Sequence, residues 1–413
     1  MSFAAGHGFA LLVMAIAAGF LVYTYAGYPL LMSWLQRKRW RYGPARADTV
    51  AAAEDAHAAL PPLTILISAF NAQAHIQRKL ASMLALDYPA DKLSVLVVSD
   101  GSVDATNDLV EAVSRQDDRV RLLAFAERRG KAACLNDAVA ATSTELLLLT
   151  DARQTFKPDA ARRLVRHFAD PAVGAVSGAL EIDPAAPGGD GVVASAGAYW
   201  RMEKKLRAAE SQVHSAVGVT GAIYALRRAA FEPIPAQTIL DDVLIPMVAV
   251  MNGWRVLFDR EAVAFDLASI SEAQERQRKI RTLAGNFQLV ALRPALVSPA
   301  RNPLWWQFFS HKLFRVLAPV AMAAFLLANV GLAGAGLFWL WLLLAQLLVY
   351  TVTVLPEGQG ALWQTKPMRL LKTLRGFVRL QWFAVLGFVW FWRNRQPQLW
   401  ETTRHAGATR ETR

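Results

Sequence analysis

The sequence predicts an α/β domain built on a mostly parallel sheet and held between membrane-spanning helices. Three observations predict this class. Hydrophobic residues make up 54% of the 413-residue chain, a share that favours a membrane protein over a purely soluble one. Short apolar runs alternate with helical patterns from residue 63 to residue 150, which is typical of βαβ units. Long uncharged runs near both ends have the length that a bilayer crossing requires.

Charge and cysteine content narrow the class of protein further. The formal net charge is +12, and basic residues gather beside the hydrophobic segments, so we expect anionic membrane lipid rather than nucleic acid as the partner. The single cysteine, Cys134, excludes an internal disulfide and fits a reducing compartment. We expect Cys134 to be a small buried residue without a reactive role.

The N-terminal segment is predicted to cross the membrane once. Residues 8–35 carry no charge, and roughly 20 residues suffice for a crossing. The run is too long for the core of a signal peptide. Basic residues follow it directly, and the positive-inside rule then places the N-terminus outside. We assign residues 1–36 to a transmembrane helix and residues 37–60 to a cytosolic basic juxtamembrane segment and linker.

Residues 61–300 are predicted to form a soluble domain. Its first strands are predicted at residues 63–70, 93–99, 120–125 and 145–150, and the helices between them at residues 72–86, 104–116 and 131–141. Strands joined by helices run parallel, so their carboxyl ends meet at one edge of the sheet. Asn71, Asp100 and Asp151 each follow a strand directly, and we expect all three to line one crevice at that edge.

Asp151 ends a run of four leucines, which is the pattern of a strand buried on both faces. Taken alone, it is either a turn or capping residue, or a ligand for a metal ion that carries an anionic substrate. The sequence has no P-loop and no GxGxxG after the first strand, so the dinucleotide-binding and ATP-hydrolase classes lack their required backbone. An acidic crevice receives a nucleotide diphosphate only through a divalent cation, and Mg²⁺ or Mn²⁺ suits that task.

The later part of the soluble domain is predicted in less detail. We expect a strand pair at residues 172–182, a loop at 184–191, a helix at 192–212, a strand at 217–226, a helix at 243–251 and a basic helix at 271–292. The charged stretch at residues 201–205 is interpreted as a solvated face, with contact to an acceptor as the alternative. Of Asp241 and Asp242, one is expected to cap the following helix, which leaves the other free to take a proton.

Several short motifs, each weak alone, occur in an order and spacing that resemble a known family. They are Ser68-Ala-Phe-Asn71, Asp87-Tyr-Pro, Val98-Ser-Asp100-Gly-Ser102, Gly130-Lys131 with Leu135-Asn136, Thr150-Asp151-Ala152, Gly221-Ala-Ile-Tyr224-Ala-Leu-Arg227-Arg228 and Leu240-Asp241-Asp242. The chain resembles the membrane-embedded, inverting family-2 glycosyltransferases of GT-A fold, which include cellulose, hyaluronan and poly-N-acetylglucosamine synthases. The resemblance extends over most of the chain.

On the donor side, the resemblance implies a role for each matching residue. Ala69, Asn71 and Asp100 would hold the uracil and ribose of a nucleotide sugar. Lys131 would lie near the same nucleotide. Asp151 would be the first aspartate of the family's DxD motif and would meet Mg²⁺ or Mn²⁺ on the diphosphate.

On the acceptor side, the resemblance implies that Asp242 is the general base, with Asp241 beside it. Further residues would face the acceptor, and these are Gly221, Tyr224, Arg278 and Arg281. Gly221 lies where the backbone can approach an acceptor sugar closely.

Two departures from the family pattern matter. Arg153 replaces the second DxD aspartate, so one expected metal ligand is missing, and Arg153 would either contact a donor phosphate or be a surface residue. Thr282 stands where the QxxRW motif of processive synthases has its tryptophan. The missing tryptophan leaves both long-chain synthesis and single transfer open.

Residues 301–413 are predicted to return to the membrane. Aromatic residues at 305–309, followed by two basic residues, form an amphipathic stretch suited to the bilayer interface. Residues 316–356 are uncharged and are interrupted by the glycine-containing segment 331–336, which fits two crossings joined by a tight turn.

The chain is then predicted to come back to the cytosol, because five basic residues lie between residues 366 and 379. The uncharged run at residues 380–392 is short, and we interpret it as interfacial or re-entrant, with a further crossing as the alternative. The expected location is a bacterial-type inner (plasma) membrane, with several crossings and a cytosolic catalytic domain.

The function that these patterns and the resemblance predict is inverting transfer of a sugar from a nucleotide-diphosphate donor, expected to be a UDP-sugar. The acceptor would be a growing polysaccharide or a glycolipid. One alternative is transfer of a single sugar to a polyprenyl phosphate or another lipid. A second is a catalytically silent membrane scaffold that senses nucleotide sugars. Accessory export or synthase subunits are possible partners in the polysaccharide case.

Overall fold

The computed structural model describes residues 2–38, 60–183, 189–266, 272–354 and 366–394 of the chain. The chain divides into two compact units. The sheet unit includes residues 32–274 and 288–305, and the helical unit includes residues 1–31, 275–287 and 306–393. The first contains the strands, and the second contains the long apolar helices.

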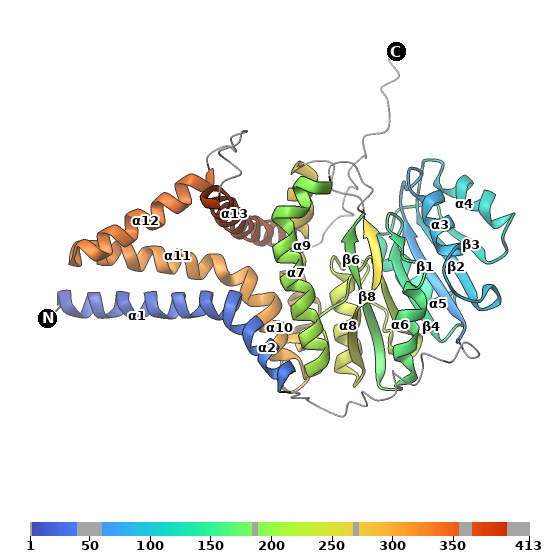
Figure 1. Ribbon diagram of the computed structural model, residues 1–413, viewed down its shortest axis with the longest axis horizontal. Coiled ribbons are helices and arrows are strands. Elements are labelled where there is room, and N and C mark those ends of the chain that lie inside the picture. The colour runs from blue at the N-terminus through green and yellow to red at the C-terminus, as the bar shows by residue number, and fades with distance from the viewer. Residues whose placement is uncertain (1, 39–59, 184–188, 267–271, 355–365, 395–413) are drawn as a thin grey trace, which may run out of the picture. The chain divides into compact units, whose positions relative to one another are not determined.

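The sheet unit is built on an eight-stranded sheet (Figure 1). Its strands are β1 (Leu63–Ala69), β2 (Leu93–Asp100), β3 (Val120–Phe125), β4 (Leu146–Asp151), β5 (Thr155–Phe156), β6 (Val173–Ile182), β7 (Tyr224–Arg227) and β8 (Arg255–Asp266). They lie in the order β3-β2-β1-β4-β7-β6-β8-β5. The first four strands of this order run parallel, β7 is antiparallel to β4 and β6, and β8 is parallel to β6. The predicted mostly parallel sheet is confirmed.

Helices connect these strands and supply much of the core. They are α3 (Ile76–Leu84), α4 (Thr106–Ser114), α5 (Lys131–Ala140), α6 (Ala160–Val165), α7 (Gly189–Val213) and α8 (Asp241–Met251). Helix α3 buries Ile76, Leu80 and Met83 in the same cluster as Ile65 of β1 and Val97 of β2. Full burial of each such side chain stabilises the fold by about 1.5–3 kcal/mol. The amphipathic pattern of this segment therefore predicts both that it is helical and which of its faces is buried.

The carboxyl ends of β1, β2 and β4 are level with one another at one edge of the sheet. Ala69 is paired with Ser99, and Ser68 is paired with Asp151. The four leucines of β4 are at most 2% exposed, which confirms a strand buried on both faces. Asp151 is consequently carried to the edge on a rigid central strand.

Two expected strands differ from the structure. Residues 173–182 form the single strand β6 rather than a strand pair. Strand β7 begins only at Tyr224, and Gly221 lies in the turn before it. The preceding backbone is bonded to other elements, because Ala216 N donates to Val256 O and Val219 N donates to Asp242 O at 2.8 Å. Ala216 is thereby bonded to β8 and Val219 to the start of α8, so this segment does not extend the pairing of β7 with β4 and β6.

The start of α8 also differs from the prediction. The helix begins at Asp241, and its N-cap is Leu240, which makes no side-chain capping bond. The expectation that an aspartate caps this helix is therefore wrong. Both aspartates lie in the first turn instead, where the helix dipole favours negative charge.

The helical unit contains two long helical segments with a π-helix inside each. Its elements are α1 (Ser2–Val22), a π-helix (Tyr23–Gly27), the start of α2 (Tyr28–Arg37), part of α9 (Glu272–Leu292), α10 (Trp305–Phe308), a second π-helix (Phe309–Leu313), α11 (Phe314–Leu332), α12 (Leu337–Val354) and α13 (Lys366–Arg393). Helices α1 and α11 lie side by side (Figure 1). The two π-helices are linked, because Tyr23 Oη and Ser310 Oγ are 2.8 Å apart and Trp306 Nε1 donates to Tyr23 Oη.

Among the described residues, three helical segments are long and apolar enough to cross a membrane, judged by length and composition. They are Gly6–Arg37, Trp305–Ala335 and Leu371–Arg393, and Leu337–Thr351 is a shorter apolar helix. The aromatic stretch at 305–309 is the beginning of the second segment, with Phe308 fully buried. The run at 380–392 is not a separate short segment, because it belongs to the 28-residue α13. Its length favours the alternative of a further crossing.

Candidate active site

An ion cluster lies at the carboxyl edge of the sheet. Lys131 begins α5, Asp151 ends β4 and Asp241 begins α8. The Nζ atom of Lys131 lies 2.9 Å from Asp151 Oδ1 and 3.0 Å from Asp241 Oδ2. Three segments that are far apart in the sequence thus bring one cation and two carboxylates together.

The charges of this cluster are stabilised by one another. Burial lowers the pKa of the Lys131 amine, but the neighbouring Asp151 and Asp241 carboxylates raise that pKa well above its usual value. Burial raises the pKa of Asp151, but Lys131 outweighs this effect and holds the pKa below its usual range. Both groups are therefore charged at neutral pH. The Asp151 side chain is still 42% exposed, so the cluster is open to a ligand from the solvent side.

Asp242 lies next to this cluster, beside the turn that precedes β7. Asp242 is half-buried, and a Cβ added at Gly221 would lie 3.5 Å from Asp242 Cβ and 3.6 Å from Lys131 Nζ. The absence of a side chain at Gly221 keeps the space beside both groups open. The structure thus brings Gly221, Asp242 and Lys131 together, and their roles toward a donor and an acceptor remain predictions.

Tyr224 is buried below the same cluster. The side chain is 1% exposed, and its hydroxyl has no hydrogen-bond partner among the described residues. Burial, followed by the nearby charge of Asp241, raises the pKa of Tyr224 well above its usual value. An unpartnered buried hydroxyl is costly, and such a group is a frequent mark of a functional site.

Asp100 organises the loop that leads to Lys131. Its carboxylate accepts a bond from Arg129 N at 2.6 Å and from Gly130 N at 2.9 Å. Gly130 has φ 94°, a left-handed conformation that favours glycine. The Asp100 carboxylate and this glycine together fix the start of α5.

The loop after β1 is tied to the loop after β2. Asn71 has φ 48°, and its Oδ1 accepts a bond from Val103 N at 3.0 Å. Asn71 N donates to Ser102 Oγ at 3.1 Å. Ala69 ends β1 and is 2% exposed. The donor-side residues therefore lie at one edge of the sheet, and their contact with a nucleoside remains a prediction.

Arg153 makes a structural ion pair. Its Nη2 lies 2.6 Å from Asp266 Oδ2 at the end of β8, and the Asp266 side chain is only 8% exposed. Arg153 is therefore not a simple surface residue, which was one of the two alternatives. Among the described residues the Arg153 guanidinium makes no ion pair with the Lys131 cluster, although its positive charge helps to lower the pKa of Asp151.

Sequence reasoning missed a buried lysine beneath β4. Lys79 on α3 is fully buried, and its Nζ donates to Thr150 Oγ1 at 2.7 Å and to Gln154 O at 2.8 Å. It thereby joins the two ends of the segment that carries Asp151 and Arg153. Burial lowers the pKa of Lys79 to about 7, although Asp151 acts in the opposite direction. The signal was present, since position 79 falls on the same helical face as Ile76 and Met83.

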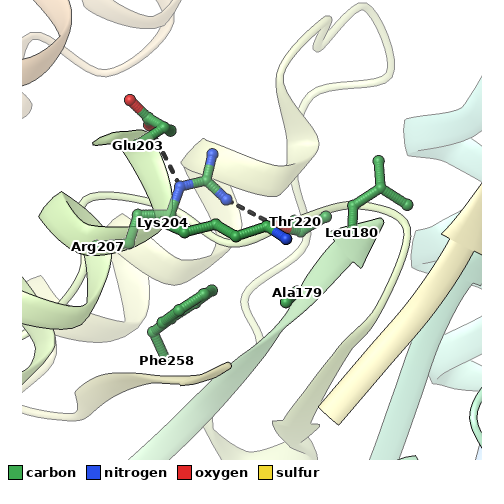
Figure 2. Close-up of a pocket in the computed structure, with 7 residues that line it drawn as sticks. All are labelled: Ala179, Leu180, Glu203, Lys204, Arg207, Thr220 and Phe258. Atoms are coloured by element: carbon green, nitrogen blue, oxygen red, sulfur yellow. Dashed lines mark hydrogen bonds and ion pairs between the residues drawn. The ribbon is translucent and has the colours of Figure 1, made fainter. Parts of the chain in front are cut away.

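A small pocket lies between α7 and the strands β6 and β8, and about 220 Å³ of space, open solvent included, lies within it (Figure 2). Its lining residues are Ala179, Leu180, Glu203, Lys204, Arg207, Thr220 and Phe258. Arg207 Nη1 donates to Thr220 Oγ1 at 2.7 Å, and Arg207 Nε donates to Glu203 Oε1 at 3.3 Å (Figure 2).

This pocket corrects the interpretation of residues 201–205 as a uniformly solvated face. Glu203 is 5% exposed, whereas Arg201 and Lys205 are exposed. Thr220 lines the pocket and directly precedes Gly221, so the pocket is adjacent in the chain to the turn beside Asp242. The sequence signal for it was the stripe Glu203, Leu206, Arg207 at helical spacing.

The two predicted acceptor-side arginines lie on the part of α9 that belongs to the helical unit. Arg278 pairs with Glu275 at 3.0 Å, one turn earlier in the same helix. Thr282 is exposed on this helix. A contact of Arg278 or Arg281 with an acceptor remains a prediction.

The residues of the cluster fit a divalent cation that arrives with a substrate. The described residues contain no group of three or more His, Cys, Asp or Glu side chains placed to hold a metal ion by themselves. Asp151 and Asp241 nevertheless converge on one ammonium group, which is a stand-in cation. Mg²⁺ commonly uses one or two carboxylates together with substrate phosphates, so this oxygen-only set suits it.

Comparisons with known proteins agree with this architecture. A family model described as glycosyltransferase like family 2 matches residues 61–285, more than half of the chain. Beta-monoglucosyldiacylglycerol synthase of Synechocystis is 24% identical, with 89% of this chain and 80% of that protein covered. Poly-beta-1,6-N-acetyl-D-glucosamine synthase of Staphylococcus aureus is 31% identical over 29% of this chain and 28% of that protein, well short of its whole length.

One solved structure has the same fold over nearly its whole length. It is the mannosyltransferase PcManGT from Pyrobaculum calidifontis, in complex with GDP-Man and Mn²⁺. The TM-score is 0.68 at 23% identity, with 92% of this chain and 99% of that chain covered. At this identity the likeness shows a shared fold.

Proposed function

Since this chain belongs to glycosyltransferase family 2, whose members are inverting, we propose that it transfers a sugar from a nucleotide-diphosphate donor to a hydroxyl group of a membrane-bound acceptor. The observation that carries the proposal is the cluster of Lys131, Asp151 and Asp241 beside Asp242 at the carboxyl edge of the sheet. Ligands of open α/β folds bind at this edge.

In the proposed reaction, the Asp242 carboxylate accepts the proton of the acceptor hydroxyl. The acceptor oxygen forms a bond to the anomeric carbon of the donor sugar, and the bond from that carbon to the diphosphate oxygen breaks. Its electron pair leaves with the nucleotide diphosphate. Lys131 would neutralise part of the charge on that leaving group, because its amine lies at the same edge of the sheet as Asp242. A divalent cation at Asp151 would supply further positive charge there.

The donor is proposed to lie against the loops after β1 and β2. Asn71 and the loop that Asp100 orders are close to the start of α5, which presents Lys131 toward the diphosphate position. A UDP-sugar remains the expected donor from the resemblance. The solved relative is described with GDP-Man, so the identity of the base is an outcome of the experiment below.

We favour a lipid as the acceptor and a single transfer as the outcome. A relative that the chain matches over most of its length is described as beta-monoglucosyldiacylglycerol synthase, and the tryptophan of the processive QxxRW motif is replaced by Thr282. Growth of a polysaccharide is the second candidate. It is supported by the poly-N-acetylglucosamine synthase, although that match covers less than a third of either chain.

The acceptor would approach between Gly221 and the pocket on α7. Gly221 leaves space beside Asp242, and the preceding Thr220 lines the pocket with Arg207. The Glu203–Arg207 pair and Phe258 line this pocket with a few hydrogen-bonding groups beside an apolar surface, as small-molecule sites commonly do. A membrane-bound acceptor fits a chain whose helices are long and apolar enough to span a bilayer.

The proposal is tested with the purified full-length chain in proteoliposomes that contain diacylglycerol or a polyprenyl phosphate. A panel of radiolabelled UDP- and GDP-sugars is supplied, and the lipid products are separated by thin-layer chromatography. We expect label on diacylglycerol with one added sugar. Label on the polyprenyl phosphate would mean that the acceptor is a phosphate oxygen and not a hydroxyl group. A ladder of products would replace single transfer by polymer growth, and binding of a nucleotide sugar without any transfer would support the silent scaffold instead.

A further inference from the structure

Asp151 alone supplies the charge expected of a two-aspartate DxD motif. Arg153 occupies the position of the second aspartate, and its guanidinium forms an ion pair with Asp266 at 2.6 Å. Arg153 therefore cannot replace a carboxylate by its charge, and its ion pair holds it to β8. A cation on the donor diphosphate would need a second acidic group from another part of the fold.

The fold supplies such a group from α8. Asp241 Oδ2 and Asp151 Oδ1 both contact the single Nζ atom of Lys131, at 3.0 Å and 2.9 Å. Two carboxylates that share one ammonium group already converge on one positive centre. The sequence left Asp241 as either the helix cap or the general base. In the structure Asp241 does not cap α8, and it is only 5% exposed, so it is poorly placed to meet an acceptor.

A separate observation marks the same place as a ligand position. The Tyr224 hydroxyl is buried and has no hydrogen-bond partner among the described residues. The charges that act on it most strongly belong to Asp241 and Lys131. A buried oxygen left without a partner beside two carboxylates is the kind of group that an incoming cation or its water completes.

The side chain of Lys131 has the freedom to move away from this position. Its side chain is 31% exposed, and the lysine stem has four rotatable carbons. Gly221 leaves room beside the amine, because even an added Cβ there would lie 3.6 Å from Nζ. The amine can turn toward a diphosphate on the open side while its backbone stays at the start of α5.

We propose that Lys131 occupies the cation position of the ligand-free protein, and that Asp241 takes the place of the missing second aspartate when a divalent cation displaces Lys131. The site is thus an exchange site, in which Asp151 and Asp241 pass from the ammonium group to the metal ion, and Lys131 passes to the donor phosphates. This inference rests on the proposed function, because the donor diphosphate is the destination of Lys131. It explains how the carboxylate lost at position 153 is compensated.

The test measures binding of Mn²⁺ alone, without any nucleotide, to the full-length chain in detergent. Free Mn²⁺ is followed by its electron paramagnetic resonance signal during titration. Lys131→Met removes the competing ammonium, and we expect it to bind Mn²⁺ at least about tenfold more tightly than the wild type. Lys131→Arg keeps the charge and should show no gain. Lys204→Met is the matched control. Lys204 Nζ also lies 2.9 Å from a carboxylate oxygen, that of Glu181, but this pair is not part of the cluster.

The role of Asp241 is tested in the Lys131→Met background. Adding Asp241→Asn should abolish the gain in Mn²⁺ affinity, and adding Asp242→Asn should leave most of it. Without metal, Lys131→Met leaves two carboxylates unpaired and lowers stability, so Mn²⁺ should raise its melting temperature more than it raises that of the wild type. That second measurement distinguishes a folded, metal-binding variant from an unfolded one.

Two results would overturn the inference. In the first, Lys131→Met binds Mn²⁺ no more tightly than the wild type and gains no thermal stability from it. In the second, the gain in Mn²⁺ affinity persists after Asp241→Asn is added. That result would mean that Asp151 binds the metal ion without help from Asp241. Neither measurement uses sugar transfer. A chain that passes this test and transfers no sugar would therefore refute the proposed function and keep the exchange site.

Discussion

Arg153 Nη2 lies 2.6 Å from Asp266 Oδ2, so the residue that replaces the second DxD aspartate is tied to the end of β8. Gln154 Nε2 reaches the same oxygen at 3.3 Å. The turn after β4 is therefore fastened on one side by Asp266 and on the other by Lys79, which bonds to Thr150 and to the backbone of Gln154. The position of Asp151 depends on both fastenings.

We predict that Arg153→Ala lowers stability more than it weakens donor binding. The variant leaves the buried Asp266 carboxylate without its guanidinium, at a cost of about 1–3 kcal/mol in the free energy of unfolding. The melting temperature should fall by several degrees, while the KM for the donor stays within about twofold. Arg162→Ala, which removes a more exposed pair with Asp87, should change the melting temperature little. A donor KM raised tenfold or more by Arg153→Ala would mean that Arg153 binds a phosphate.

Arg153→Asp restores the family's second aspartate in sequence, yet we predict that it does not restore a metal ligand. The new carboxylate would replace the guanidinium beside Asp266, so two like charges would face each other at a partly buried position. We expect lower stability than for Arg153→Ala and no increase in Mn²⁺ affinity. A tighter Mn²⁺ complex would show that the turn can aim residue 153 at the metal.

The sequence predicted those parts of the site that local patterns define. Asp151 could be placed because a run of leucines marks a buried strand, and parallel strands end at a common edge. The contact of Lys131 with Asp241 could not be predicted, because it depends on how the segment before β7 bonds to the start of α8. The same detour explains why β7 is shorter than its apolar sequence suggested.

Helical spacing contained information that composition alone concealed. Lys79 and Glu203 belong to a class of residue that is mostly exposed, but both lie on buried stripes of their helices. The length of helix α13 was underestimated for a related reason. Its uncharged run covers only part of the 28-residue helix. Basic residues with long stems extend such a helix into the membrane interface without ending it.

Asp242 is expected to be the general base. Asp242→Asn should lower the rate of transfer by about 10²–10⁴, the usual cost of losing a positioned base. Donor affinity, measured by calorimetry with an unreactive nucleotide diphosphate, should remain near that of the wild type, because the donor loops rest on Asn71 and Asp100. Gly221→Ala is a useful companion, since its methyl group would sit 3.5 Å from Asp242 Cβ and narrow the approach without strain. Full transfer by Asp242→Asn would move the base to another residue.

The topology is predicted from basic residues that flank the apolar segments. Residues 50 and 362, both outside the described residues, should be cytosolic. Single cysteines introduced there, in a Cys134→Ala background, should not react with a membrane-impermeant maleimide in intact cells and should react after permeabilisation. Labelling of either position from outside would reverse the orientation. A tag in the C-terminal tail reports separately on whether α13 crosses, since four crossings place that tail outside if α12 also crosses.

Lys79 predicts an unusual dependence of stability on pH. Burial lowers its pKa from 10.5 to about 7, so between pH 7 and pH 10 the unfolded chain binds more protons at this residue than the folded chain does. Stability conferred by this residue should therefore rise with pH, by up to about 1.4 kcal/mol for each pH unit. Compared with Lys79→Met, the wild type should gain melting temperature as the pH is raised from 7 to 9. Parallel curves for the two proteins would show that Lys79 stays charged when buried.

The pocket on α7 leads to the last prediction, which separates acceptor binding from donor binding. Arg207 bonds to both Glu203 and Thr220, and Thr220 precedes the glycine beside Asp242. If the acceptor enters here, Arg207→Gln should raise the KM for the lipid acceptor about tenfold or more, equivalent to the roughly 1.4 kcal/mol of one charged hydrogen bond. The donor KM and the slow hydrolysis of donor by water should change less than twofold. Lys204→Gln provides the control, because Lys204 lines the same pocket but pairs at its rim with the exposed Glu181. Equal changes in the donor and acceptor constants for Arg207→Gln would show that the Glu203–Arg207–Thr220 chain only supports the fold.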